Sequence, residues 1–167
     1  PISKNQKVPS GPLHLVTCRK CQLIQLKHNF NRSKMFGKNY GYESGLNQSM
    51  KRHLKNVLDY TLKFVSISNS DPVVDIGSND GTLLNYFGKN KKNLYGIDPT
   101  INKKFKNLYN KNINCISKLF DNIAVDFLKN KIKKAKIVFS ISMFYDLPNP
   151  VKFAKNIKEI IGDDGIW

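Results

Sequence analysis

The sequence predicts an α/β protein whose main part is a doubly wound, mainly parallel β-sheet over residues 71–167. Short apolar runs typical of buried strands recur there roughly every 20 to 25 residues, and each is followed by a helical pattern. The first run, residues 73–76, leads directly into a glycine-containing turn of the kind that joins a parallel strand to its helix. The preceding residues do not share this pattern and divide into two segments, 1–45 and 46–70.

The first segment contains turn-forming proline and glycine residues and only two short apolar runs, 13–16 and 23–26. The first run alternates as a short strand does and predicts a strand that leads up to Cys18. Residues 36–45 are rich in glycine and tyrosine and predict a loop. The second segment, 46–70, predicts a connecting helix, because apolar residues recur in it at three- and four-residue spacing.

Strands and helices alternate through the rest of the chain. The strand runs are almost continuously apolar, as expected for strands buried on both faces, whereas the helical stretches place apolar residues three and four positions apart. The predicted strands are 73–76, 93–97, 113–116, 136–141 and one at Ile166 after a turn at 162–165, and the predicted helices are 80–88, 103–109, 122–131 and 151–161.

A net charge of +16 comes from 28 basic and 12 acidic residues. Such an excess is typical of proteins that bind nucleic acids, phosphates or acidic lipids. However, 25 of the basic residues are lysine, and arginine, which specific phosphate and base sites favour, is scarce. Together with 20 asparagines, this is the composition that an AT-rich coding sequence produces. The lysines are also scattered, which argues against a nucleic-acid partner and favours solvated faces, with anion attraction as the alternative.

Three cysteines, Cys18, Cys21 and Cys115, are too few for a disulfide framework, so we expect an intracellular, cytoplasmic protein. The longest near-continuous apolar run, 137–145, is much shorter than the roughly 20 residues of a membrane helix, so no membrane partner is expected. The chain begins without methionine and ends at Trp167, within a predicted strand. We therefore expect it to be part of a longer protein.

The turn after residues 73–76 carries the strongest functional pattern, Asp-Ile-Gly-Ser-Asn-Asp-Gly. Its two glycines allow unusual backbone dihedral angles and a close approach to a ligand. The spacing differs from the Gly-x-Gly-x-x-Gly of nicotinamide binders, and acidic side chains stand where a pyrophosphate needs none. An ammonium group and a ribose suit them better. The candidate cofactor residues of this turn are Asp75, Gly77, Ser78, Asn79, Asp80 and Gly81.

A second acidic residue, Asp98, ends the next predicted strand about 20 residues after the first glycine, where a carboxylate can bind ribose hydroxyls. Ligands of doubly wound sheets bind at the carboxyl ends of the strands. We therefore expect Ser142, Tyr145 and Asp146, which follow the fourth strand, to face the same cleft. A helix N-cap role for Asp146 or Asn149 is the alternative there. For the glycine turn itself, the alternative is a strand–helix connection selected for packing.

The glycine turn and Asp98 together resemble the motif pair of class I S-adenosyl-L-methionine-dependent methyltransferases, whose fold is Rossmann-like. Four further segments are similar, in order and spacing, to the sugar C-methyltransferase family with an N-terminal zinc-binding module. The similar segments are PLHLVTCRKCQLIQL at 12–26, YGYESGLNQSMKRHL at 40–54, SISMFYDLPNP at 140–150 and GDDGIW at 162–167. The resemblance covers nearly the whole chain.

This resemblance implies a cofactor, a substrate and a metal. S-adenosyl-L-methionine would be bound by the glycine turn, Asp98 and Ser142, and the substrate would be a nucleotide-diphosphate keto-deoxysugar, methylated on carbon. The family has a structural zinc on two Cys-x-x-Cys pairs, of which only Cys18 and Cys21 are present, so residues 1–45 would be a partial zinc module and full-length protein would hold the metal. Two incidental thiols are the alternative. The Tyr and His that act around the base step in the family would lie beyond Trp167.

Candidate substrate-side residues lie on the glycine-rich loop. Tyr40, Tyr42 and Ser44 have hydroxyl groups that can meet a sugar carbonyl or hydroxyl, as can Tyr145 after the fourth strand. Tyr42 is the catalytic candidate within this chain. The tyrosines can instead pack the loop against the core, and His53 is read as a helix-face residue.

Two other functions are consistent with the sequence. One is a class I methyltransferase with another small-molecule acceptor, because the sheet and both cofactor motifs serve many chemistries. The other is a basic zinc-ribbon protein that binds nucleic acid, which would show steep salt dependence. The sequence does not indicate which sugar is methylated or the oligomeric state.

Overall fold

A computed structural model describes residues 10–36 and 40–167, and the chain divides into two compact units between Met35 and Phe36. The two units are described separately. Their boundary falls before the one predicted at residue 45, because the backbone of residues 42–45 is hydrogen-bonded to side chains of the larger unit. The glycine-rich loop and the connecting helix therefore belong to the same unit as the sheet.

The N-terminal unit contains an antiparallel hairpin of β1 (Leu15–Thr17) and β2 (Ile24–Leu26), followed by a one-turn helix, α1 (Arg32–Met35). The N–H of Cys18 donates to the carbonyl of Leu23 at 2.9 Å, which closes the connection between the strands. The strand predicted at 13–16 is confirmed as β1, shifted to Leu15–Thr17, and the apolar run at 23–26 contains β2. Cys18 and Cys21 lie in the connection.

The larger unit is built on a five-stranded sheet with the order β5-β4-β3-β6-β7, in which all neighbouring pairs are parallel. Every residue of β3 and β4 is buried, which explains their nearly uniform apolar sequences. The chain runs from β3 outward to β5 and then returns past β3 to β6, so the strand order reverses beside β3. The predicted doubly wound parallel sheet is confirmed. Its strands are β3 (Val73–Ile76), β4 (Leu94–Ile97), β5 (Ile113–Ile116), β6 (Ala135–Phe139) and β7 (Ile161–Ile166).

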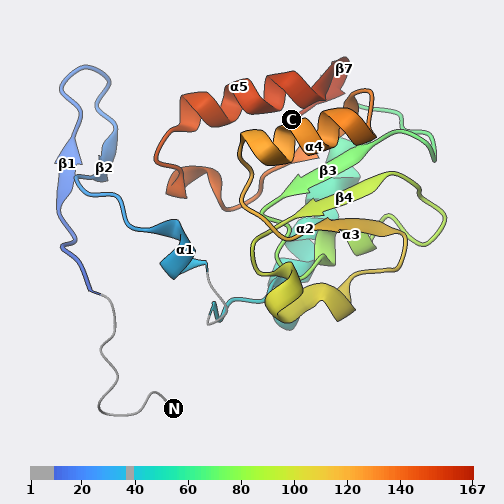
Figure 1. The fold of residues 1–167 in the computed structure, drawn as a ribbon, viewed down its shortest axis with the longest axis horizontal. Helices are drawn as coiled ribbons and strands as arrows, with labels where there is room; N and C mark the ends of the chain where they lie inside the picture. Colours follow the sequence, from blue (N-terminus) through green and yellow to red (C-terminus); the bar gives the residue numbers. More distant parts are fainter. Residues whose placement is uncertain (1–9, 37–39) are drawn as a thin grey trace. The chain divides into compact units, whose positions relative to one another are not determined.

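Helices cover both faces of the sheet (Figure 1). One face carries α2 (Gln48–Thr61) and α3 (Thr82–Asn85), and the other carries α4 (Asn122–Lys131) and α5 (Pro150–Ile160). Successive strand residues point to opposite faces. Val73 consequently belongs to the core under α2 and α3, whereas Val74 belongs to the core under α4 and α5. Because all five strands are parallel, the loops that follow them lie at one end of the sheet, where the strands have their carboxyl ends.

Short polar side chains begin the longer helices. Asn47, Asp121 and Asn149 each accept a hydrogen bond from a backbone N–H in the first turn of α2, α4 and α5, respectively. Pro150 occupies the first turn of α5, where its missing N–H costs nothing. The N-cap role is therefore confirmed for Asn149, whereas Asp146 lies in η4 (Phe144–Asp146), a short 3-10 turn.

Three predicted elements differ from the structure. The helix predicted at 80–88 is shortened to α3, because the chain beyond it forms tight turns that end at Gly88, with a φ of 75°. The weak helix predicted at 103–109 is a π-helical turn, η2 (Ile101–Phe105), followed by a 3-10 turn, η3 (Lys106–Leu108). The turn predicted at 162–165 lies inside β7, where a register shift between Ala135 and Ile137 accommodates the extra residues.

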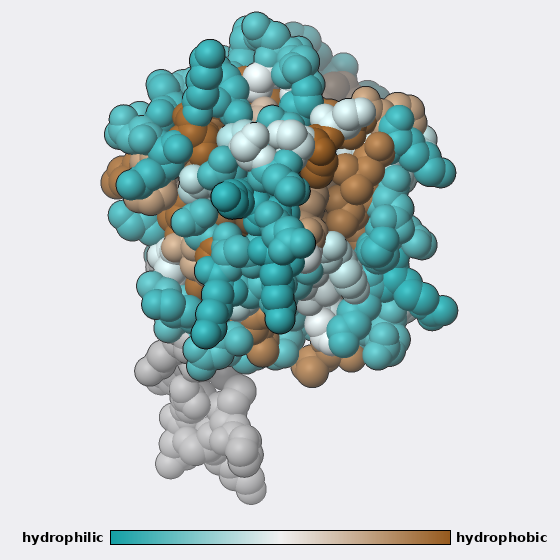
Figure 2. Space-filling view, turned by 90° about the vertical axis from the view of Figure 1, so that its right-hand side faces the viewer, coloured by the Kyte–Doolittle hydropathy of each residue, from teal (hydrophilic) through white to brown (hydrophobic). Residues whose placement is uncertain are grey.

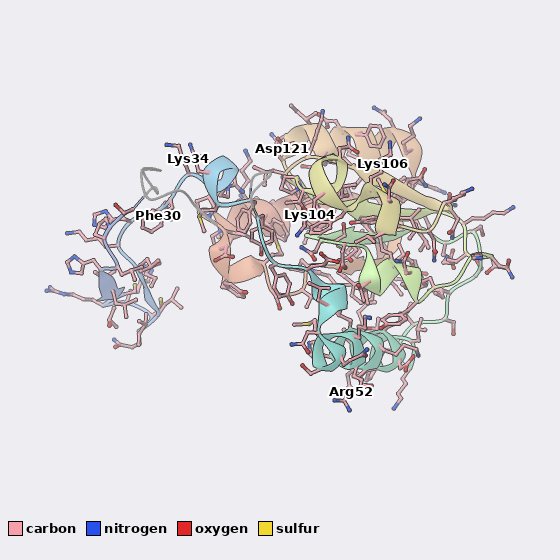
Figure 3. All side chains as sticks on the ribbon, turned by 90° about the horizontal axis from the view of Figure 1, so that it is seen from below. Phe30, Lys34, Arg52, Lys104, Lys106 and Asp121 are labelled. Carbon is pink, nitrogen blue, oxygen red and sulfur yellow. The ribbon has the colours of Figure 1, made fainter. Side chains whose placement is uncertain are left out.

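Hydrophilic side chains dominate the face shown in Figure 2, with hydrophobic residues between them in patches. Arg52 likewise points away from the sheet on the outer side of α2 (Figure 3).

Lys91 differs from the solvent-exposed lysines that the sequence predicts, because it is buried. Its Nζ donates to the carbonyl of Ser68 at 2.6 Å and to that of Asp71. None of the helices in the described part of the chain combines the length and the apolar character that a membrane-spanning helix requires.

The core under α4 gives a stability prediction. Leu128 is fully buried, whereas Ile123 on the same helix is 62% exposed. Leu128→Ala should lower the free energy of unfolding by about 2–5 kcal/mol, since it removes buried methyl groups and leaves a cavity. The matched control, Ile123→Ala, should change it by no more than about 0.5 kcal/mol. Urea unfolding measures both, and equal effects would contradict the packing of α4 on the sheet.

Candidate functional site

The turn that follows β3, residues 77–81, is hereafter called the cofactor turn. Gly77, Asn79 and Gly81 adopt positive φ values of 76°, 50° and 78°. Glycine adopts this conformation freely, and asparagine is one of the few other residues that tolerate it. The N–H of Gly77 donates to the carbonyl of Ile97 at 2.8 Å, so the end of β3 stays joined to the end of β4. The backbone thus reverses sharply at the carboxyl end of β3, beside which the strand order of the sheet reverses. Doubly wound sheets bind their ligands at this position.

Asp98 joins the cofactor turn to the end of β4. Its Oδ2 accepts the N–H of Asn79 at 3.1 Å, and its Oδ1 accepts the N–H of Thr100 at 2.8 Å and the hydroxyl of Thr100. A carboxylate has about four acceptor positions, so one position on Oδ2 is left for a further donor. The two halves of the predicted motif are therefore bonded to each other directly.

Asp75 lies within β3, beneath the cofactor turn, and is only 4% exposed. Burial raises its pKa from 3.8 to about 8, with further contributions from the negative charges of Asp98 and Asp80. Among the described residues, it forms no hydrogen bond through its carboxyl group. A buried carboxyl group without a bonded partner, next to two other carboxylates, makes this site favourable to a positively charged ligand.

Tyr109 is a residue of the site that the sequence analysis missed. Its hydroxyl donates to the carbonyl of Asn79 and is bonded to the hydroxyl of Ser78, both at 2.8 Å. Burial raises the pKa of Tyr109 despite the bond from Ser78. A Cβ on Gly81 would lie 2.7 Å from the tyrosine ring, and one on Gly96 would lie 2.8 Å from it. The glycine inside β4 was the available signal, because such a glycine often marks a close approach.

Residues 42–45, hereafter the docking segment, reach the cofactor turn from the glycine-rich loop. The side chain of Asn79 donates to the carbonyl of Tyr42 at 3.1 Å and accepts the N–H of Ser44 at 2.9 Å. Asp80 accepts the N–H of Gly45 at 2.6 Å. The motif resemblance alone had placed these segments in one site, and the structure brings them into contact. The Tyr42 side chain is itself 44% exposed.

Tyr40 also lies in the electrostatic environment of this site. Its pKa is raised first by burial and then by the negative charges of Asp98 and Asp146. The Tyr40 and Tyr42 rings are 6.5 Å apart, measured between centroids. Tyr145 contributes to the same shift, although its side chain is 77% exposed. Tyr40 is therefore within electrostatic range of Asp98 and of the other predicted substrate-side tyrosines, Tyr42 and Tyr145.

The turn after β6 approaches the cofactor turn from the other side of β3. Ser142 has a φ of 56° and is exposed, and the side chain of its neighbour Met143 would lie 3.1 Å from a Cβ placed on Gly77. Ser142 is thus beside the site, with no contact that defines its role. His53, by contrast, is exposed on α2, as the helix-face interpretation predicted.

The predicted zinc ligands lie in the N-terminal unit. Backbone hydrogen bonds, first from Cys21 and then from Lys20, lower the pKa of Cys18 and favour its thiolate. The part of the chain that the structure describes contains no group of three or more histidine, cysteine or acidic residues arranged to hold a metal ion. Two cysteines supply only half of a structural zinc site.

Comparison with known proteins identifies the family. The sequence profile of a methyltransferase domain matches residues 47–167, which includes the connecting helix, the whole sheet and the cofactor turn. The chain belongs to this methyltransferase domain family. The predicted class of protein is thereby confirmed from α2 to the end of β7.

One curated relative extends this similarity to the N-terminal unit. The chain is 24% identical over 157 residues to the C-methyltransferase NovU of Streptomyces niveus. The alignment covers 93% of this chain but only 37% of that protein.

The buried carboxyl group of Asp75 gives a prediction about pH. In the folded protein its pKa of about 8 keeps it protonated at pH 7, whereas it is ionised when the chain unfolds. The stability that this protonated group contributes is therefore complete below about pH 4 and is lost progressively as the pH rises to about 8. In Asp75→Asn, the free energy of unfolding relative to the wild type should rise from pH 5 to pH 8, with a slope of at most about 1.4 kcal/mol per pH unit.

Urea unfolding of both proteins at several pH values measures this difference. A difference that stays constant over this range would show that Asp75 does not titrate there.

Proposed function

We propose that this chain is the cofactor-binding part of an S-adenosylmethionine-dependent C-methyltransferase that acts on a nucleotide-diphosphate keto-deoxysugar. The observation that carries the cofactor assignment is a hydrogen bond between two adjacent parallel strands. The carboxylate of Asp98, at the end of β4, accepts the backbone N–H of Asn79 in the cofactor turn that follows β3. The methyltransferase family and the similarity to a C-methyltransferase support the reaction class. The sugar acceptor rests on the resemblance of the segments described above.

The residues fit the cofactor chemically. S-adenosylmethionine supplies an electrophilic methyl group on a sulfonium, and it carries a ribose and an amino-acid ammonium. Asp98 has an acceptor position for a ribose hydroxyl. Asp80 and Asp98 supply negative potential for the positive groups. A bound cation would also favour the ionised form of Asp75, which is buried without a hydrogen-bonded partner in the described part of the chain. The close fit between Tyr109 and Gly81 holds the backbone N–H and carbonyl groups of the turn in fixed positions.

The acceptor side is assigned to Tyr40, Tyr42, Ser44 and Tyr145. Carbon methylation requires a base that removes the proton beside a ketone. The resemblance places that base beyond Trp167, so the tyrosines of this chain would orient the acceptor next to Asp98. Tyr42 is the candidate for direct contact, because its side chain is exposed while its backbone is held by Asn79.

Binding of the demethylated cofactor, S-adenosylhomocysteine, tests the site. Asp98→Ala should weaken binding by about 1.5–3 kcal/mol, the free energy of hydrogen bonds to a charged group. Asp126→Ala, which removes an exposed carboxylate from α4, is the matched control and should leave the affinity unchanged. Isothermal titration calorimetry measures both. Equal affinities of wild type and Asp98→Ala would refute the assignment, as would equal affinity for a nicotinamide dinucleotide.

The acceptor is tested separately, in the longer protein. That protein should transfer a labelled methyl group to a keto-deoxysugar nucleotide. Transfer only to acceptors of another class would refute the sugar assignment and leave the cofactor site intact.

We also propose that Cys18 and Cys21 provide two ligands of a zinc ion in the longer protein. A chain with a second Cys-x-x-Cys pair should hold one zinc with four sulfur ligands at about 2.3 Å. The 167-residue chain should bind zinc weakly, because two thiolates leave half of the tetrahedron to water. X-ray absorption and chelator competition measure this. Stoichiometric, chelator-resistant zinc in the 167-residue chain would contradict this ligand set.

A further inference from the structure

Asn79 occupies an unusual position, because its backbone and its side chain serve different parts of the site. Its N–H donates to Asp98, and its carbonyl accepts the hydroxyl of Tyr109. Its side chain points the other way, donating to the carbonyl of Tyr42 and accepting the N–H of Ser44. The backbone therefore builds the cofactor turn, while the carboxamide is committed to the docking segment.

Asp80 repeats this arrangement one residue later. Its Oδ1 accepts two hydrogen bonds from Thr82, the first residue of α3: one from the N–H at 3.0 Å and one from the hydroxyl at 2.7 Å. Its Oδ2 accepts the N–H of Gly45. A Cβ on Gly45 would lie 2.9 Å from both Asp80 Oδ2 and Thr82 Oγ1, so only glycine can approach this closely. Asn79 and Asp80, which bind the docking segment, are each more than nine-tenths buried.

A third contact joins the docking segment to the chain after β4. Glu43 Oε2 lies 3.7 Å from the Nζ of Lys104, which extends from η2 and is labelled in Figure 3. Both side chains are partly exposed, so this ion pair contributes little. The attachment of the docking segment therefore depends on Asn79 and Asp80.

We propose that Asn79 and Asp80 are positioning residues that fasten the docking segment to the cofactor turn, so that cofactor binding also orders the acceptor-side tyrosines. This inference rests on the proposed function, which places the cofactor at the turn and the acceptor at Tyr40 and Tyr42. A ligand that holds the turn in one conformation must strengthen any contact that requires this conformation, and the coupling is reciprocal. Among the described residues, all hydrogen bonds between the cofactor turn and the docking segment are made by the side chains of Asn79 and Asp80.

Amide hydrogen exchange of the 167-residue chain, measured by NMR, tests this proposal. Asn79→Gly removes the carboxamide but preserves the positive φ and the backbone bonds to Asp98 and Tyr109. It should speed exchange of the Ser44 N–H at least tenfold, relative to the N–H of Val74 in the buried strand β3. Asp80→Ala should do the same for Gly45, whereas Asp80→Asn retains an acceptor oxygen and should restore most of the protection.

The coupling is measured by repeating the experiment with S-adenosylhomocysteine. The ligand should slow exchange of Ser44 and Gly45 at least threefold in the wild type, and Asn79→Gly should lose that response at Ser44. Lys104→Ala removes the partly exposed ion pair with Glu43 and the contact of Nζ with the Phe105 ring, and leaves the bonds of Asn79 and Asp80 in place. It is the control and should behave like the wild type.

The outcomes separate the two proposals. If the wild type binds S-adenosylhomocysteine but its Ser44 and Gly45 N–H groups do not respond, or if Asn79→Gly responds like the wild type, the positioning role is refuted and the cofactor assignment stands. If the wild type does not bind the ligand, the proposed function fails and the coupling fails with it. Acceleration of Val74 to the same degree as Ser44 would show general destabilisation and would also refute the specific role.

Discussion

The hydrogen bond between the N–H of Asn79 and the carboxylate of Asp98 is the contact on which the rest of the site depends. It joins the loops that follow two adjacent parallel strands, and the residue that donates it, Asn79, has a positive φ. The same conformation presents the carbonyl of Asn79 to Tyr109 and its carboxamide to the docking segment. One backbone conformation thus positions three separate segments of the chain.

A buried environment makes these contacts effective, and it also has a cost. Asp75, Asp80 and Asp98 are all buried near one another. Asp80 and Asp98 accept hydrogen bonds from several backbone and hydroxyl groups, whereas the structure shows no such donor for Asp75 among the described residues. Burial, and then the charges of Asp98 and Asp80, raise the pKa of Asp75. Functional sites commonly retain such unfavourable groups, because the ligand supplies the missing charge.

Much of the fold followed from the sequence, but the element bounds did so unevenly. β3, β5 and α4 lie at their predicted residues, since continuous apolar runs and three- and four-residue spacing are strong local signals. β7 was misplaced, because a strand with two glycines and two aspartates has no apolar pattern and is held by its pairing with β6. α3 was predicted too long, because its apolar residues are buried by tertiary packing that does not require a longer helix.

The sequence by itself determined the parallel sheet, the glycine turn and the acidic residue at the end of β4, because these are properties of residue type and short-range order. Only the tertiary structure decided which partners the turn has. Tyr109 and Gly45 are distant from the turn along the chain, so no local pattern indicated that they pack against it. The direction of the Asn79 and Asp80 side chains was likewise decided by the docking segment, because a buried polar group must take the hydrogen-bond donors and acceptors that the fold places nearby.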